Sequence, residues 1–173
     1  MRGLPLLPGL SRFPELNVRT YVSYGDKAGV YFFSLDAGNR IAVSAARLFY
    51  HLPYFWAKMR VAASGAEISY SSRRYKRPAV FRARYKATSE VQSQLKGTLA
   101  HWLTERYCLY AISNGNVYRA EIHHEPWPLQ NAEAEIGVNT MADAAGITLP
   151  RTAPLLHFAR RLEVLIWPLL RVS

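Results

Sequence analysis

The feature that most limits the fold is the alternation of polar and apolar side chains in residues 15–37, which read ELNVRTYVSYGDKAGVYFFSLDA. In the first half of this segment, Leu16, Val18 and Val22 fall on one face of an extended chain. The other face carries Asn17, Arg19, Tyr21 and Ser23. A period of two residues predicts a strand, and the GDKAG segment supplies a turn before the apolar run VYFFSLDA. We therefore predict a β-hairpin over residues 15–37.

Further short segments along the chain also have the character of strands. We predict them at 55–63, at 66–72, at 79–87, in a hairpin around the Asn114-Gly115 turn, over AEAEIGVNTM, and near the C-terminus, where Pro168 interrupts an apolar run. These segments are short and closely spaced, as in domains that consist mainly of antiparallel sheet.

Helical patterns are few and short. The segment GNRIAVSAARLFYHL has Asn39 as a candidate N-cap and is stopped by Pro53. Its apolar residues on one face are Ile41, Ala45, Leu48 and Phe49. Residues 97–103 and 141–147 fit shorter helices. Many strands with few helices predict an α+β, mainly β domain, either a barrel or a sandwich with inserted helices.

Composition limits the partners and the compartment. The 173 residues suit one domain, and we expect a single domain over residues 1–173 with a formal net charge of +10. Such a surface attracts anions: nucleic acid, acidic lipid, or a carboxylate or phosphate substrate. Cys108 is the only cysteine, which excludes an internal disulfide and indicates a cytoplasmic protein. No apolar run is long enough for a signal peptide or a membrane span, so we expect no membrane association.

The basic stretch RRYKRPAVFRARYK, residues 73–86, contains cations and aromatics but no acid. Interleaved aromatics and cations are typical of proteins that bind single-stranded nucleic acid. The stretch also fits a plain hairpin, with Phe81, Ala83 and Tyr85 facing in and Arg82, Arg84 and Lys86 facing water. We favour the solvated hairpin and do not expect nucleic acid to be the main partner.

Motifs for metal or cofactor chemistry are absent from the sequence. His123 and His124 are adjacent, so on a strand they point to opposite faces and only one could join a metal site. Phosphate-binding loops, dinucleotide-binding glycines and the G-x-S-x-G signature of many hydrolases are missing. We therefore predict no metal and no cofactor.

Polar residues on two predicted strands are the candidates for a binding site. The first strand offers Glu15, Asn17, Arg19 and Tyr21. The segment LTERYCLYA repeats the theme, with Glu105, Tyr107 and Leu109 on one face and Arg106, Cys108 and Tyr110 on the other. Burying Arg19 unpaired would cost several kcal/mol, so an inner position requires a carboxylate or a bound anion. The two strands could pair across a closed barrel around such an anion, or form salt bridges with no ligand.

Five segments carry a resemblance to a known family: FPELNVRTYV, GVYFFSLDA, RLFYHLPYFWAKMRV, LTERYCLYA and HHEPWPLQ. They resemble an uncharacterised bacterial family, a domain of unknown function related to the acetoacetate decarboxylase-like superfamily, and the similarity runs over nearly the whole chain from about Leu4. Members of that family carry a further N-terminal stretch, so the resemblance implies that an early strand pair is missing here. The edge without that pair would be exposed, or filled by another subunit of a homo-oligomer.

The resemblance implies a cone-shaped antiparallel β-barrel with a few short helices around a cavity. In acetoacetate decarboxylase a cavity lysine forms a Schiff base with a β-keto acid, and a neighbouring lysine lowers its pKa. In ARLFYHLPYFWAKM, Arg47 and Pro53 match that pattern, whereas the lysine pair falls on Tyr54 and Phe55. Because the pair is absent, we do not expect Schiff-base decarboxylation. Lys58 is the nearest amine, displaced by several positions and alone.

Three more residues complete the candidates, the first from this resemblance and the other two from the sequence pattern. Glu15 fits the position of a glutamate that helps to line the decarboxylase cavity. In HLPYFWAKMR, we expect Tyr54 and Trp56 on one side of the barrel wall, with at least one ring facing the cavity. Plain core packing of these aromatics is the competing interpretation.

The function that we predict is binding of a small organic acid or similar anion in an enclosed barrel cavity, and its turnover is left open. The predicted ligand-binding residues are Asn17, Arg19, Tyr21, Arg47, Tyr54, Trp56, Arg106 and Tyr110, and the catalytic candidates are Glu15, Glu105 and Lys58. The alternative is a non-catalytic basic module that binds nucleic acid or an acidic partner through residues 73–86.

Overall fold

The computed structural model describes residues 13–76 and 78–173, and it is mainly β with two α-helices. The strands are β1 Glu15–Tyr24, β2 Lys27–Ala37, β3 Tyr54–Ser64, β4 Glu67–Arg74, β5 Val80–Ala87, β6 Cys108–Ser113, β7 Asn116–His124, β8 Gln130–Asn139, β9 His157–Phe158, β10 Val164–Ile166 and β11 Leu170–Arg171. The helices are α1 Arg40–Tyr50, α2 Leu99–Thr104 and the short 3-10 helix η1 Asp143–Ala145. The start of the family resemblance near Leu4 and residue 77 of the basic stretch lie outside the described residues.

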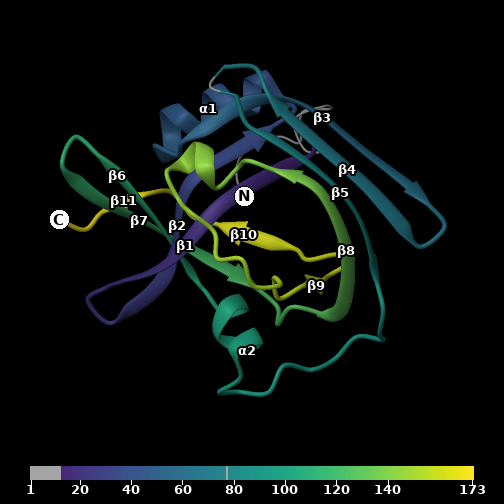
Figure 1. Ribbon diagram of the computed structural model, residues 1–173. Coiled ribbons are helices and arrows are strands. Elements are labelled where there is room, and N and C mark those ends of the chain that lie inside the picture. Colours follow the sequence, from purple (N-terminus) through teal and green to yellow (C-terminus); the bar gives the residue numbers. More distant parts are fainter. Residues whose placement is uncertain (1–12, 77) are drawn as a thin grey trace.

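The predicted hairpin over residues 15–37 is confirmed. Strands β1 and β2 pair antiparallel from Glu15 opposite Ala37 to Tyr24 opposite Lys27. A β-bulge interrupts the register between Val18 and Arg19. Because a bulge bends and twists the bulged pair, it lets the hairpin curve across the molecule (Figure 1).

Strand β2 joins two halves of the sheet. One edge of β2 pairs with β1 along its whole length. The other edge pairs in parallel with β6 at Val30 and Tyr31, and in parallel with β3 from Leu35 to Ala37. Strands β6 and β3 therefore share this edge of β2. The first half of the sheet, β6, β7 and β10, extends from the start of β2, and the second half, β3, β4, β5, β8 and β9, extends from its end. Figure 1 shows β3, β4, β5 and β8 curving together along one side of the molecule.

This topology departs from the expected antiparallel barrel in two ways. The β2–β3 and β2–β6 pairs are parallel, whereas the other strand pairs among the described residues are antiparallel. The β2–β3 pair is parallel because α1 lies between the two strands in the chain. The helix returns the chain to the end of the sheet at which β2 began, so β3 runs in the same direction as β2. The strand order is also an open path within the described residues, with β10 and β9 at its ends.

A hydrophobic core fills one face of β2 and its neighbours. Its buried members are Val30, Leu35, Leu52, Leu109, Ala111 and Ala120. Tyr21, Phe32 and Tyr54 are half-buried and pack against this cluster. The core therefore ties β1, β2, β3, β6 and β7 together where the two halves of the sheet meet.

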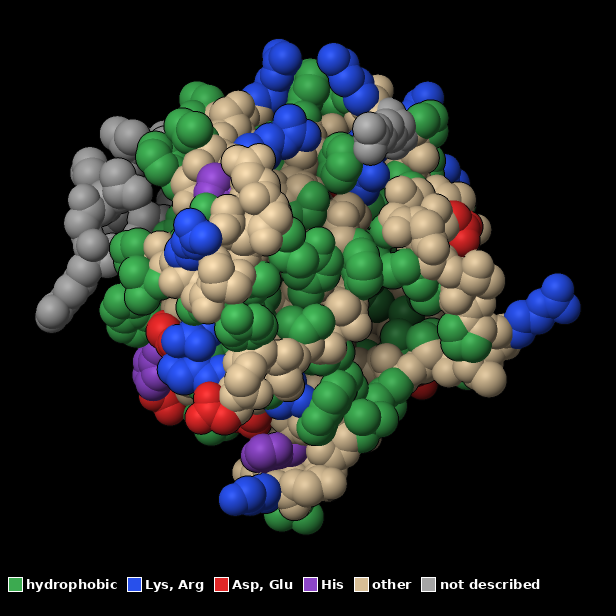
Figure 2. Space-filling view, turned by 90° about the vertical axis from the view of Figure 1, so that its left-hand side faces the viewer, with side chains coloured by type: hydrophobic (Ala, Val, Ile, Leu, Met, Phe, Trp, Pro, Cys, Tyr) green, Lys and Arg blue, Asp and Glu red, His purple; other side chains and the backbone are tan. Residues whose placement is uncertain are grey.

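Helix α1 begins as predicted, because the Asn39 side chain accepts hydrogen bonds from the backbone N–H groups of Ile41 and Ala42. The helix ends at Tyr50, and His51 follows in a left-handed conformation with φ 51°. The apolar face predicted from sequence is exposed: Ile41, Leu48 and Phe49 are 67%, 69% and 67% accessible. Figure 2 views the side of the molecule that carries α1 and the β6–β7 hairpin, where apolar and basic side chains are mixed.

Within the described residues, no helix is both long and apolar enough to cross a membrane.

Candidate functional site

The polar row predicted on the first strand faces inward. Residues directly opposite one another in an antiparallel pair point to the same side of the sheet. The members of the row and their partners on β2 are Glu15 with Ala37, Asn17 with Leu35, Arg19 with Phe32 and Tyr21 with Val30. Val30 and Leu35 belong to the buried core, so the row lies on the core side of the sheet.

The first end of this row is a carboxyl–phenol pair. Tyr54 Oη donates to Glu15 Oε2 at 2.5 Å, and Tyr70 Oη donates to the backbone oxygen of Glu15 at 2.7 Å. The side chain of Glu15 is accessible to water, yet burial raises the pKa of its carboxyl above 4.5, against the lowering effect of the Tyr54 hydrogen bond. Tyr54 and Tyr70, whose hydroxyls both reach Glu15, are among the groups that surround this carboxyl. Burial also raises the pKa of Tyr54, so its phenol stays a hydrogen-bond donor.

The other end of the row is a cluster of arginine and aromatic side chains. The guanidinium carbons of Arg19 and Arg106 lie 5.7 and 5.6 Å from the centre of the Tyr21 ring. Trp102 completes the cluster, because Arg106 lies 4.2 Å from the centre of its ring and the Tyr21 ring lies 4.9 Å away. Within residues 13–76 and 78–173, no carboxylate lies within 4.0 Å of Arg19 or Arg106. The Arg106 Nε is buried and has no hydrogen-bond partner in that part of the chain.

The end of α2 places Arg106 in this cluster. Thr98 caps the helix by accepting from the N–H of His101 at 3.3 Å. The N–H of Glu105 donates to the His101 oxygen, and the N–H of Arg106 donates to the Thr104 oxygen. These bonds continue the turn, so the strand predicted over ERYCLYAIS begins only at Cys108. Arg106 is therefore free of the strand's alternation and points to Tyr21.

Three predicted residues lie apart from the arginine–aromatic cluster. Tyr110 is buried, and its hydroxyl donates to the Lys27 oxygen at 2.8 Å, on the face of β6 opposite to the core residue Leu109. Glu105 accepts a hydrogen bond from the Tyr107 hydroxyl, which raises the pKa of Tyr107 to about 12. Lys58 is exposed on the outward face of β3, where its cross-strand neighbour is Arg73.

The remaining two predicted residues support β3. Arg47 Nε donates to the backbone oxygen of Tyr54 at 2.7 Å, which holds the start of β3 against α1. Trp56 lies between Arg40, whose guanidinium carbon is 4.1 Å from its ring centre, and Tyr75, whose ring is stacked at 3.6 Å. Both faces of the Trp56 ring are therefore covered.

Sequence reasoning missed a buried ion pair and assigned one of its members to the solvated surface. Arg74 Nη2 lies 2.7 Å from Asp36 Oδ1, and its Nε donates to the same oxygen at 2.9 Å. The side chains of Arg74 and Asp36 are 2% and 0% accessible, and Arg74 also covers the Phe55 ring at 3.9 Å. The signal that could have found the pair is Asp36, a lone acid within the apolar run VYFFSLDA.

The described part of the chain contains no group of three or more His, Cys, Asp or Glu side chains that could hold a metal ion.

The raised pKa of Glu15 predicts a pH effect with a definite sign. A folded protein that binds this proton more tightly than the unfolded chain loses stability as pH rises from about 4.5 through the folded pKa. Glu15→Gln keeps an acceptor for Tyr54 but removes the titration. We therefore expect the stability of the wild type relative to Glu15→Gln to fall as pH rises through this window, measured by urea unfolding. The exposed Glu133→Gln is the control, and equal pH profiles for wild type and Glu15→Gln would contradict the assignment.

The comparison with protein families decides where the chain belongs. The DUF2071 family, described as an uncharacterized conserved protein, matches residues 1–163. The chain belongs to this family. Another protein similar to this DUF2071 chain is the "Uncharacterized protein YqjF" of Bacillus subtilis (strain 168), which is 53% identical over 173 residues, covering 99% of this chain and 72% of the relative.

Solved structures extend the comparison to the fold. The acetoacetate decarboxylase of Legionella pneumophila matches 93% of this chain and 67% of its own with a TM-score of 0.66 at 11% identity. A second structure, titled as a structural study of acetoacetate decarboxylase, matches 92% of this chain and 68% of its own with a TM-score of 0.64 at 13% identity. At these identities the likeness establishes the fold alone. The resemblance stated from the sequence, a family of unknown function with an acetoacetate decarboxylase-like fold, is confirmed.

Proposed function

We propose that the chain binds a small organic acid on the inward face of β1, with its carboxylate between Arg19 and Arg106. The observation that carries the proposal is the buried Nε of Arg106, which has no hydrogen-bond partner among the described residues. A buried donor without an acceptor costs about 1–3 kcal/mol, and a carboxylate would supply the acceptor and the opposite charge. The rings of Tyr21 and Trp102 would pack against the carbon skeleton of the ligand.

Any chemistry on such a ligand would occur at the other end of the row. Glu15 lies four residues from Arg19, or about 13 Å along the strand at ~3.3 Å per residue. A ligand that extends from Arg19 past Asn17 would meet the carboxyl of Glu15 and the phenol of Tyr54. A carboxyl whose pKa is raised by burial holds its proton more tightly than a free one does, which makes Glu15 the candidate proton donor or acceptor for such a ligand.

The proposal includes an enclosed cavity, and side chains rather than a strand ladder would close it. Tyr70 of β4 reaches across to the backbone of Glu15 on β1, although β1 pairs only with β2 in the described residues. This hydrogen bond joins the second half of the sheet to the edge strand β1. Tyr70 shares its face of β4 with Ser72 and Arg74, opposite to the row, so on the row's own side the wall of the cavity would be Tyr54, whose hydroxyl donates to Glu15.

The ligand class agrees with the fold neighbours, which are acetoacetate decarboxylases and take their name from acetoacetate, a small β-keto acid. The mechanism would differ, because Lys58 is exposed on the outward face and Tyr54 and Phe55 occupy the positions of the lysine pair. We propose binding through arginine without a Schiff base. Borohydride reduction in the presence of acetoacetate is then expected to leave the mass of the protein unchanged.

Titration calorimetry with acetate, pyruvate and acetoacetate tests the proposal. We expect Arg19→Ala and Arg106→Ala each to raise the Kd of the ligand that binds by roughly 10- to 100-fold, since a hydrogen bond to a charged group contributes about 1.5–3 kcal/mol. The control is Arg161→Ala, because this side chain is 80% accessible and pairs only with Glu163 in the described residues. Unchanged affinity in both site variants, or no binding of any of these acids by the wild type, would rule the proposal out.

A further inference from the structure

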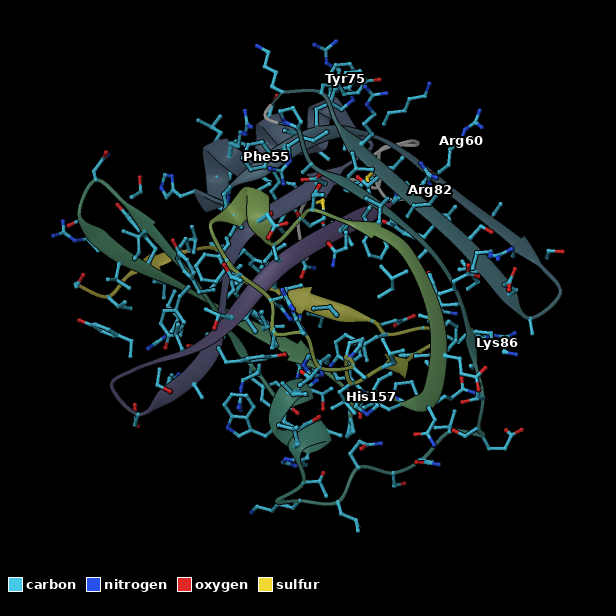
Figure 3. All side chains as sticks on the ribbon, in the orientation of Figure 1. Phe55, Arg60, Tyr75, Arg82, Lys86 and His157 are labelled. Atoms are coloured by element: carbon cyan, nitrogen blue, oxygen red, sulfur yellow. The ribbon has the colours of Figure 1, made fainter. Side chains whose placement is uncertain are left out.

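The outward face of the second half of the sheet has a feature that the proposed function does not use. The strand register places Arg60 of β3 opposite Ser71 of β4, and Ser71 opposite Arg82 of β5. Both arginines are exposed, and Figure 3 shows them close together on the outer side of these strands. Neighbouring strands are about 4.8 Å apart, so the two backbones are about 10 Å apart and flexible guanidinium groups can converge over Ser71.

This row borders an open depression of about 550 Å³. Its lining is shared by four strands: Arg60 and Ala62 of β3, Ser69, Tyr70 and Ser71 of β4, Arg82, Ala83 and Arg84 of β5, and Glu135 and Gly137 of β8. The small residues Ala62, Ser69 and Ser71 form the floor, and long basic side chains stand around it. The β5–β8 register shifts between Arg82 and Ala83, so Gly137 has no paired residue on β5, and as a glycine it adds no side chain at the edge of the depression.

The basic groups of this face are only partly neutralised. Arg84 is paired with Glu135 at 2.5 Å, and Lys86 is paired with Glu133 at 3.4 Å. For Arg60 and Arg82, no carboxylate lies within 4.0 Å in residues 13–76 and 78–173. Neighbouring cations that repel one another attract a multivalent anion, which lowers the electrostatic energy of the whole patch.

From these observations we infer that the depression binds the phosphate group of a small phosphorylated molecule. Guanidinium groups bind tetrahedral phosphate oxygens in a bidentate manner, and the hydroxyls of Ser69 and Ser71 add short donors at the floor. The volume of about 550 Å³ also leaves room for the rest of a small ligand beside its phosphate.

A nucleic acid strand fits this face less well than a small phosphate ester does. Proteins that bind single strands present aromatic rings on which bases stack. The Trp56 ring of β3 is covered on its two faces by Arg40 and Tyr75, and Tyr75, which is 53% exposed, already has one face stacked on Trp56. We therefore expect the arginines of this face to bind the phosphate of a small molecule. The stacked bases of a nucleic acid strand, which the basic stretch of residues 73–86 suggested, would find little free ring surface here.

Titration with inorganic phosphate and with adenosine monophosphate tests the inference. We expect both to bind, phosphate to displace the nucleotide, and Arg60→Ala and Arg82→Ala each to weaken binding at least tenfold. Arg161→Ala should bind as the wild type does. Arg19→Ala should also keep its phosphate affinity, whereas Arg82→Ala should keep its affinity for organic acids. The experiments can therefore contradict the phosphate site without contradicting the organic-acid site, and the reverse.

Two further outcomes would overturn the inference. The first is equal phosphate affinity in the wild type, Arg60→Ala and Arg82→Ala, which would leave only diffuse attraction to a basic surface. The second is tight binding of a single-stranded oligothymidylate that millimolar phosphate does not displace, which would assign the face to nucleic acid. Far-UV circular dichroism of each variant confirms that loss of binding is not loss of folding.

Discussion

Replacing Arg74 with methionine is expected to lower the free energy of unfolding by about 3–5 kcal/mol, because it leaves the buried carboxylate of Asp36 without its partner. The Asp36 side chain is 0% accessible, and its other hydrogen bond in the described residues is a long one of 3.5 Å from Ser72. Neither water nor Ser72 can replace the guanidinium. The loss also removes the contact of Arg74 with the Phe55 ring.

Urea unfolding of Arg74→Met measures this effect, and Arg73→Met is the matched control. Arg73 precedes Arg74 on β4 but is exposed on the opposite face, so its replacement should change stability by no more than about 0.5 kcal/mol. The double variant Asp36→Leu with Arg74→Met should recover most of the loss, since apolar residues of similar volume often replace buried ion pairs without cost. Equal stability of Arg74→Met and Arg73→Met would contradict the burial of the pair.

The strands could be predicted from sequence because each carries its own alternation. Phe81, Ala83 and Tyr85 do face in, while Arg82 and its alternate neighbours are exposed, as the pattern in residues 73–86 predicts. Pairing partners could not be predicted in the same way. The residues of β2 do not predict that one edge of this strand pairs in parallel with both β3 and β6. That pairing depends on where α1 and the later connections return the chain.

The candidate site shows the same division between local and non-local information. Arg19 and Tyr21 could be placed on one face by counting along β1, and the structure brings Arg106 to them. Alternation along LTERYCLYA predicted that Tyr110 lies beside Arg106, and this was wrong. The turn at the end of α2 separates Arg106 from the alternation of β6. The burial of Arg74 was not predicted, because a run of basic residues is typical of a solvent-exposed surface. Only the pairing register with β3 shows which arginine of the run points inward.

Replacing Gly29 with alanine is expected to destabilise the fold by about 1–3 kcal/mol or more, because the added methyl group would overlap fixed atoms. A Cβ at this position would lie 2.5 Å from the backbone oxygen of Cys108 and 2.8 Å from the Tyr110 ring. The backbone oxygen belongs to β6 and cannot rotate away. Relief of the overlap therefore requires β2 and β6 to separate.

The matched control is Gly137→Ala, whose Cβ would have Arg82 O at 3.9 Å as its nearest neighbour, so stability should stay the same or rise by about 0.4–1 kcal/mol. Gly29→Ala should also weaken organic-acid binding. Among the described residues the β2–β6 ladder consists of the pairs at Val30 and Tyr31, and the chain leads directly from Arg106 into β6. Separation of β2 from β6 moves Arg106 away from Tyr21 on β1. An unchanged Kd in a variant that is clearly destabilised would show that Arg106 is positioned by α2 and not by this joint between the two halves of the sheet.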